Sequence, residues 1–230
     1  PVDLSKRYDT NELGFRADGD FEIGRRVDVI AGGRFTSVDY VEDYEGTNQL
    51  DSWDYDEVRG DLDAYVRPGD WSFAVGYSLR VRNYDERFPR DDAGEKVEDE
   101  DPGYEAQVFT YHDVSLRGGY VTDGGRAMLR FRSSRRVDEF RGYQSYSENT
   151  VSGDFRLALK ADTELRFEPG YSVRTYDNLR VAYDPQEPVS NRRRVSMDVG
   201  FEWPALSKWT RLYVAGGLVS QTSQNPLYAY

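Results

Sequence analysis

The sequence predicts an all-β fold, an antiparallel up-and-down β-barrel that spans a membrane. Three observations indicate it. Segments of about ten residues alternate apolar and polar side chains, as strands with one lipid-facing side do. Aromatic residues make up 14% of the 230 residues, with 18 Tyr and 11 Phe. The connections between these segments are alternately short and long, as in barrels that cross a bilayer.

The clearest strand pair lies between Arg59 and Arg82. In residues 59–67 small or apolar side chains alternate with Arg, Asp and Tyr, and in residues 71–82 large apolar side chains alternate with small residues and arginine. Pro68-Gly69-Asp70 separates the two segments and has the composition of a tight turn. These residues predict a β-hairpin with one apolar and one charged face.

Further segments of the same period bring the predicted number of strands to ten. In chain order they are residues 13–23, 27–35, 104–120, 127–133, 151–159, 165–173, 195–203 and 212–218. The segment 104–120 is long and has no turn residues, so we expect one tilted strand there. Pro169 weakens the prediction for 165–173, because proline cannot donate a hydrogen bond to a neighbouring strand.

The connections predict which end of each strand faces which side of the membrane. Short turns are expected at residues 24–26, 68–70, 123–125, 160–163 and 204–208, and the connections between them are long and rich in acidic residues. Short turns are typical of the periplasmic side. Both chain ends then fall on the long-loop side, so we expect residues 1–230 to be a single barrel domain that is incomplete at both ends, with twelve or more strands when complete.

The bulk composition fits a barrel better than a soluble domain. Hydrophobic residues are 38%, charged residues 31% and mean hydropathy −0.79. A barrel explains this because only every second strand residue meets lipid. No apolar run reaches the roughly 18 residues of a membrane-spanning helix. The net charge of −12 argues against nucleic acid as a partner, and the chain has no cysteine.

The charged face is the strongest site-like feature. Its arginines and carboxylates have two interpretations: a lumen filled by ion pairs, or an arginine-lined path for an anionic solute or polysaccharide. Alternation places these residues on the inward face: Arg59, Asp61, Asp63, Arg67, Arg80, Arg82, Arg126, Arg130, Arg132, Asp154, Arg156, Arg166, Glu168, Arg174, Arg194, Asp198, Glu202 and Arg211.

Other candidate sites have simpler explanations. Trp71, Trp203 and Trp209 are expected in an aromatic girdle at the membrane interface, with a sugar-stacking platform as the alternative. Acidic loops could bind divalent cations, although none has EF-hand spacing. We expect no metal site and no cofactor. Hydrolase and nucleotide-binding motifs are missing, so we expect no enzyme.

The chain resembles Gram-negative outer-membrane β-barrels, and is most similar to the porin-like type found beside exopolysaccharide or capsule genes. The resemblance rests on Tyr- and Asp-rich segments beside alternating strands, such as residues 7–11 and Asn83-Tyr84-Asp85. A resemblance to omptin-type surface proteases would imply that the single histidine, in His112-Asp113, helps to activate water. Adjacent strand residues point to opposite faces, so the two would not act together.

Three functions follow as expectations. The first is a passage for anionic solutes, and the second is a structural or partner-binding barrel with a plugged lumen inside an envelope assembly. The third, a soluble carbohydrate-binding domain, needs a second sheet to cover its apolar face. The expected location is the bacterial outer membrane. The expected partners are outer-membrane lipid, lipopolysaccharide and envelope proteins.

Overall fold

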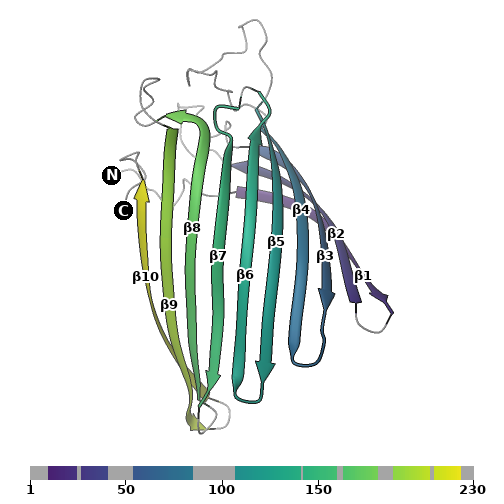
Figure 1. Cartoon of the computed structure of the whole chain (residues 1–230). Helices are drawn as coiled ribbons and strands as arrows, with labels where there is room; N and C mark the ends of the chain where they lie inside the picture. Colours follow the sequence, from purple (N-terminus) through teal and green to yellow (C-terminus); the bar gives the residue numbers. More distant parts are fainter. Residues whose placement is uncertain are drawn as a thin grey trace, which may run out of the picture.

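The computed structural model describes residues 10–24, 27–40, 54–84, 107–140, 142–159, 163–180, 189–207 and 210–223. Ten strands form one antiparallel sheet in which each strand pairs with the next along the chain (Figure 1). They are β1 Thr10–Ile23, β2 Val27–Tyr40, β3 Tyr55–Val66, β4 Trp71–Tyr84, β5 Val108–Thr122, β6 Gly125–Asp138, β7 Tyr146–Ala158, β8 Glu164–Arg180, β9 Val189–Ser207 and β10 Thr210–Ser223. The predicted all-β, antiparallel, up-and-down fold is confirmed.

Within the described ranges, no helix is long and apolar enough to cross a membrane.

Tight turns join the strands in pairs at one end of the sheet (Figure 1). Between β3 and β4, Gly69 adopts a φ of +64°, which glycine reaches without steric cost, and the Trp71 amide donates to the Pro68 carbonyl at 3.3 Å. Between β5 and β6 the turn is Asp123-Gly124, and Val121 N donates to Asp70 O of the neighbouring turn at 2.9 Å.

The strand register separates two faces. On one face, Leu62 pairs with Tyr77 and Tyr77 with Val114, so that apolar side chains adjoin from strand to strand. Most of these side chains are exposed, up to 76% for Phe15. On the other face the charged side chains adjoin. The pattern predicted from sequence alternation therefore holds for most described strand residues, with exceptions such as the Arg135–Asp177 ion pair on the apolar side.

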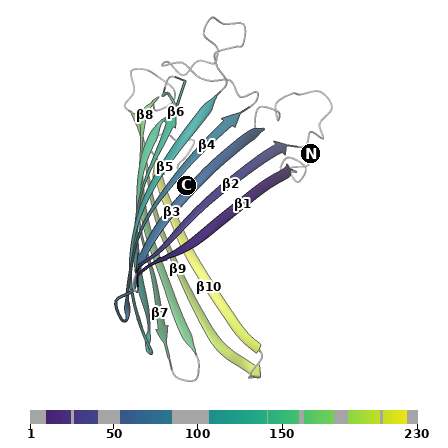
Figure 2. The ribbon, with the colours of Figure 1, turned by 90° about the vertical axis from the view of Figure 1, so that its right-hand side faces the viewer.

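The sheet is a curved wall with β1 and β10 at its two edges (Figure 2). Among the described residues, β1 pairs only with β2 and β10 only with β9. Charged side chains reach one another across an intervening strand, as Arg117 of β5 reaches Asp63 of β3. Such contacts require side chains that converge, so the polar face is the concave one. The total strand number stays a prediction.

Most strands extend beyond their predicted limits, and two of these limits and the course of β8 show how pairing sets them. β7 begins at Tyr146 rather than at residue 151, because its first residues pair with the end of β8. β9 continues to Ser207 instead of turning at 204–208, with an irregular register beside Arg211. β8 runs through Pro169, which pairs with Met197 of β9, while the pairing with β7 is interrupted between Gly170 and Phe167.

The buried core lies at the end of the sheet away from the tight turns. Phe109 and Tyr143 are each 1% exposed. Beside them the Asp138 carboxylate accepts hydrogen bonds from the amides of Phe140 at 3.3 Å and Gln144 at 3.1 Å. The connection between β6 and β7, which the sequence predicts as a long loop, is thus folded against this end of the sheet. The long acidic connections 41–53, 85–106 and 181–188 lie outside the described residues.

Candidate functional site

The register places the predicted inward residues on the polar, concave face. Arg59 pairs with Arg80, Arg126 with Arg156, and Glu168 with Asp198. Arg67 lies just beyond β3, where its Nη1 is 3.1 Å from Asp28 Oδ2. Arg211 belongs to β10, but its side chain lies outside the described part of the chain. That the polar face lines a lumen stays a prediction.

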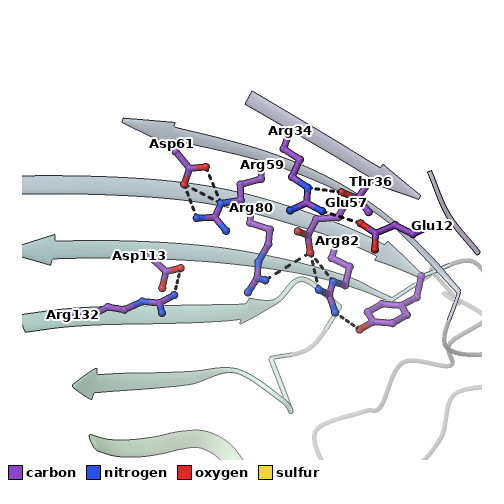
Figure 3. A network of polar contacts seen from close by, with 11 residues as sticks. Glu12, Arg34, Thr36, Glu57, Arg59, Asp61, Arg80, Arg82, Asp113 and Arg132 are labelled. Atoms are coloured by element: carbon purple, nitrogen blue, oxygen red, sulfur yellow. Dashed lines mark hydrogen bonds and ion pairs between the residues drawn. The ribbon is translucent and has the colours of Figure 1, made fainter. Parts of the chain in front are cut away.

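Glu57 of β3 holds two arginines of β4 (Figure 3). Arg82 donates to Glu57 Oε2 through Nε at 3.0 Å and Nη2 at 2.7 Å, and Arg80 Nη1 lies 3.7 Å from the same oxygen. The Glu57 side chain is only 13% exposed. One half-buried carboxylate therefore serves two guanidinium groups, which leaves an excess of positive charge at this end of the face.

A second contact spans three strands. Arg117 of β5 donates to Asp63 and, at 3.1 Å, to the Tyr65 hydroxyl, both on β3. Gly76 of β4 lies between them, and a Cβ there would collide with Asp63 Oδ1 and lie 2.8 Å from Ser115 Oγ. The missing side chain of Gly76 makes room for the Asp63–Arg117 pair.

Around this pair the face is hollowed. The hollow has a volume of about 270 Å³ and extends over β3 to β6. Two ion pairs lie on its wall: Arg59 Nε is 2.9 Å from both oxygens of Asp61, and Arg132 Nη2 is 2.7 Å from Asp113 Oδ2 (Figure 3). Guanidinium and carboxylate groups thus alternate along the wall.

A second hollow of about 410 Å³ lies on the polar face between β6 and β9. Asp154 accepts from Arg126 of the neighbouring strand and from Arg156 Nε at 3.1 Å. Arg166 pairs with Glu168 two residues along β8. Asp154 and Glu168 thus each neutralise a nearby arginine, as the ion-pair interpretation predicts.

Arg130 differs from these residues, because it has no carboxylate partner among the described residues. It lies on β6 opposite Arg117 and Ser152, and it borders both hollows. Its side chain is exposed. Arg194 of β9 likewise makes no ion pair within the described ranges. The middle of the polar face therefore carries a guanidinium group that is free to attract an anion.

Sequence reasoning missed several members of the charged face. Asp113 and Arg117 alternate with residues assigned to the apolar side of 104–120, so strict alternation would have found them. Glu57 and Glu148 were missed because they precede the predicted strand starts, and Arg136 because it follows a predicted strand end. Strand ends are the least certain part of any pattern-based prediction.

The apolar face holds Trp71, one of the three tryptophans predicted for the girdle. Trp71, at the tight-turn end of β4, stacks on Phe73 with centroids 6.1 Å apart and contacts Tyr120 at 4.6 Å. The Trp203 side chain and all of Trp209 lie outside the described residues. The girdle stays a prediction, supported by the position of Trp71.

His112 and Asp113 point to opposite faces, as expected. His112 Nδ1 lies 2.8 Å from the Tyr77 hydroxyl on the apolar face, whereas Asp113 binds Arg132 on the polar face. They cannot act as a pair. Among the described residues no three His, Cys, Asp or Glu side chains are grouped to hold a metal. The acidic loops considered for divalent cations lie outside those residues.

Two of the solved structures that resemble the chain are of OmpT, and no sequence relative is found among curated proteins. No family model and no curated protein matches the chain. One structure is a loop L8 deletion mutant of OmpT, an outer membrane protein of Vibrio cholerae, with 11% identity, a TM-score of 0.43, and coverage of 93% of this chain and 91% of that one. The other is in-vitro folded OmpT of the same organism, with the same identity and TM-score and coverage of 93% and 85%.

Both structures are of outer membrane proteins. The expectation that the chain is not an enzyme is corrected here. It rested on missing motifs alone, and the absence of a motif does not decide whether a chain is catalytic. Neither structure supports the porin type or the exopolysaccharide gene context.

Proposed function

We propose that the chain is part of an outer-membrane β-barrel that forms an arginine-lined passage for anionic solutes. The observation that carries the proposal is Arg130, which lies in the middle of the concave face without a carboxylate partner among the described residues. A paired arginine presents little net charge, whereas an unpaired one attracts anions. Charged side chains that line a pore select the permeant in this way.

The charge balance of the central strands also supports a passage that prefers anions. On the polar face of β4 to β6 there are seven arginines, two on β4, one on β5 and four on β6, against two aspartates, Asp113 and Asp138. The polar face of these three strands is therefore cationic, although carboxylates of β3 and of β7 to β9 also line the two hollows and the whole chain has a net charge of −12. Small anions and acidic polysaccharides are both solutes of the matching charge.

The test is single-channel conductance of the whole protein in a planar bilayer with a salt gradient. We expect an anion-selective reversal potential that shifts toward cations in Arg130→Gln. Arg193→Gln is the matched control, because Arg193 is exposed on the opposite face beside Val173. Cation selectivity of the unmodified protein, or equal selectivity in Arg130→Gln, would contradict the proposal.

A second candidate function is a structural or partner-binding barrel with a plugged lumen. The ion pairs that cross strands favour it, since Glu57, Asp63 and Glu148 each bind an arginine of another strand. Such pairs would fill a narrow lumen and hold the wall rigid. A folded, membrane-inserted protein without conductance would support this function instead of the passage.

The proposed partners follow from the convex face. Large side chains such as Leu13, Leu116 and Leu129 are more than half exposed there, and outer-membrane lipid would cover them. Lipopolysaccharide and envelope proteins remain proposed partners.

A further inference from the structure

Two hairpins of the sheet carry the same four-residue unit at the end away from the tight turns. In β3–β4 the unit is Tyr55 and Glu57 with Arg82 and Tyr84. Arg82 binds Glu57 at 2.7 Å, lies over the Tyr55 ring at 3.9 Å and donates to the Tyr84 hydroxyl at 3.2 Å. Glu57 thus neutralises the charge of Arg82, and the two tyrosines enclose this ion pair.

The β7–β8 hairpin repeats this arrangement almost atom for atom. Arg174 donates to Glu148 at 2.7 Å, lies over the Tyr146 ring at 4.1 Å and donates to the Tyr176 hydroxyl at 3.5 Å. In the sequence both units are Tyr-x-Glu at the start of one strand and Arg-x-Tyr near the end of the next. Two copies of so specific an arrangement indicate a common role in fixing this end of the wall.

The hairpin between them, β5–β6, has the same positions but a different charge. By register, Phe109 takes the place of the first tyrosine, Tyr111 that of the glutamate, Arg136 that of the arginine and Asp138 that of the last tyrosine. Because Tyr111 replaces a glutamate, Arg136 has no ion pair among the described residues. Its Nε and Nη2 donate instead to the Gln144 carbonyl, at 3.0 and 2.5 Å.

Tyr111 is surrounded by positive charge. Arg80 and Arg136 lie directly opposite it on the two neighbouring strands, and the Arg80 guanidinium lies 3.9 Å from the Tyr111 ring centroid. Glu57 is shared between Arg80 and Arg82, and its closer contact is with Arg82.

Asp138, two residues after Arg136 on β6, is a carboxylate close to that arginine. It is 3% exposed, and the Phe140 and Gln144 amides occupy its oxygens. A solute that reaches the Tyr111 hydroxyl therefore meets the Arg80 guanidinium on one side, the Arg136 Nη1 that the Gln144 carbonyl leaves open on the other, and a phenol donor, with no glutamate where the flanking hairpins have one.

We propose that Arg80, Tyr111 and Arg136 form a binding site for an oxyanion, the phosphate or carboxylate group of a solute that enters the barrel. Guanidinium groups pair with such oxygens through charge-assisted hydrogen bonds, and the phenol hydroxyl adds a third donor. The inference rests on the proposed function for the identity of the ligand as a passing solute. Binding at equilibrium does not require passage.

The deciding variant is Tyr111→Glu, which gives the central hairpin the glutamate of its two neighbours. Isothermal titration of the whole protein in detergent micelles would use inorganic phosphate as one probe and a glucuronate oligosaccharide as the other. We expect Tyr111→Glu to weaken binding at least about tenfold, because the new carboxylate occupies the guanidinium groups. Tyr111→Phe loses one donor only and should stay within about threefold. If only one probe binds, its oxyanion identifies the class of solute.

The reverse exchange provides an independent arm. Glu148→Tyr gives the β7–β8 hairpin the central tyrosine and frees Arg174, but the residue opposite on β6 is Ser134 and not a second arginine, so we expect no second phosphate to bind as tightly as at the central site. If Tyr111→Glu does not fold, as judged by heat-modifiable gel mobility, Arg80→Gln decides by the same titration. Unchanged phosphate and glucuronate binding in a folded Tyr111→Glu or Arg80→Gln variant would overturn the site. Binding without conductance would instead keep the site and reject the passage.

Discussion

The two faces of the sheet are held in place by different means. On the convex face large apolar side chains remain exposed, 76% for Phe15 and 70% for Leu218, and they contact few groups of the protein itself. On the concave face the charged side chains bind specific partners, and Glu57 and Arg82 are 13% and 21% exposed. The convex face needs only a lipid bilayer whose apolar layer has a matching thickness. The concave face needs particular residues opposite one another.

This difference predicts how each face tolerates change. Lipid adapts to any apolar side chain, so exchanges among Leu, Val and Phe on the convex face should cost little. An ion pair does not adapt in this way, because removing one partner leaves a half-buried charge without its counter-charge. Three experiments test the comparison, in order of expected effect.

The largest effect is expected from a charge placed in lipid. Leu116 is half exposed in the middle of the apolar face of β5. Leu116→Arg should lower the free energy of unfolding by about 2–4 kcal/mol, the cost of an arginine near the bilayer midplane. The measurement is urea unfolding in lipid vesicles.

The matched control for Leu116→Arg is Ser152→Arg on the concave face, where Ser152 borders the second hollow with Asp154 and Glu168. A smaller loss, below about 2 kcal/mol, is expected there, since the new charge faces a polar hollow and not lipid, although Arg130 lies opposite Ser152. Equal losses in the two variants would mean that lipid does not cover the convex face.

A smaller effect is expected from breaking a shielded ion pair. Glu148→Gln leaves Arg174 without its carboxylate, at a cost of about 1.5–3 kcal/mol, the usual range for hydrogen bonds to charged groups. Glu12→Gln breaks the more exposed Arg34–Glu12 pair and should cost less than about 1 kcal/mol. Urea midpoints in the same vesicles compare the two variants. A larger loss for Glu12→Gln would show that shielding does not set the strength of these pairs.

The smallest effect is expected at two glycines on opposite faces. Gly76→Ala places a methyl group against Asp63 and Ser115 on the concave face, and we expect a loss of about 1 kcal/mol. Gly60→Ala on the convex face meets no atom within 4 Å, and the lower chain entropy of the unfolded state should stabilise it by up to about 1 kcal/mol. Opposite signs of the two shifts in urea midpoint are the expected result. A stabilising Gly76→Ala would show that Asp63 and Arg117 have room to move aside.

Strand ends show where pattern reasoning failed. Alternation predicted residues 151–159 as a strand, but Tyr146 and Glu148 were assigned to a loop, because Ser147 and Asn149 carry no apolar side chain. Cross-strand partners extend the strand there: Glu148 is held by Arg174, and Tyr146 contacts Tyr176 at 5.5 Å. Strand length at this end depends on residues about 26–30 positions away, which no local pattern contains.

The sequence by itself determined the face of each strand residue, because successive side chains point to opposite sides of a strand and lipid accepts only one kind. It thereby placed Arg59, Arg130 and Asp154 on the charged side before any pairing was known. The tertiary structure alone decided which charges meet. Asp63 lies beside Arg117, 54 positions away, across Gly76, and Arg130 is left without a partner among the described residues. Register fixes these neighbours, and register is set by all the strands together, not by any one of them.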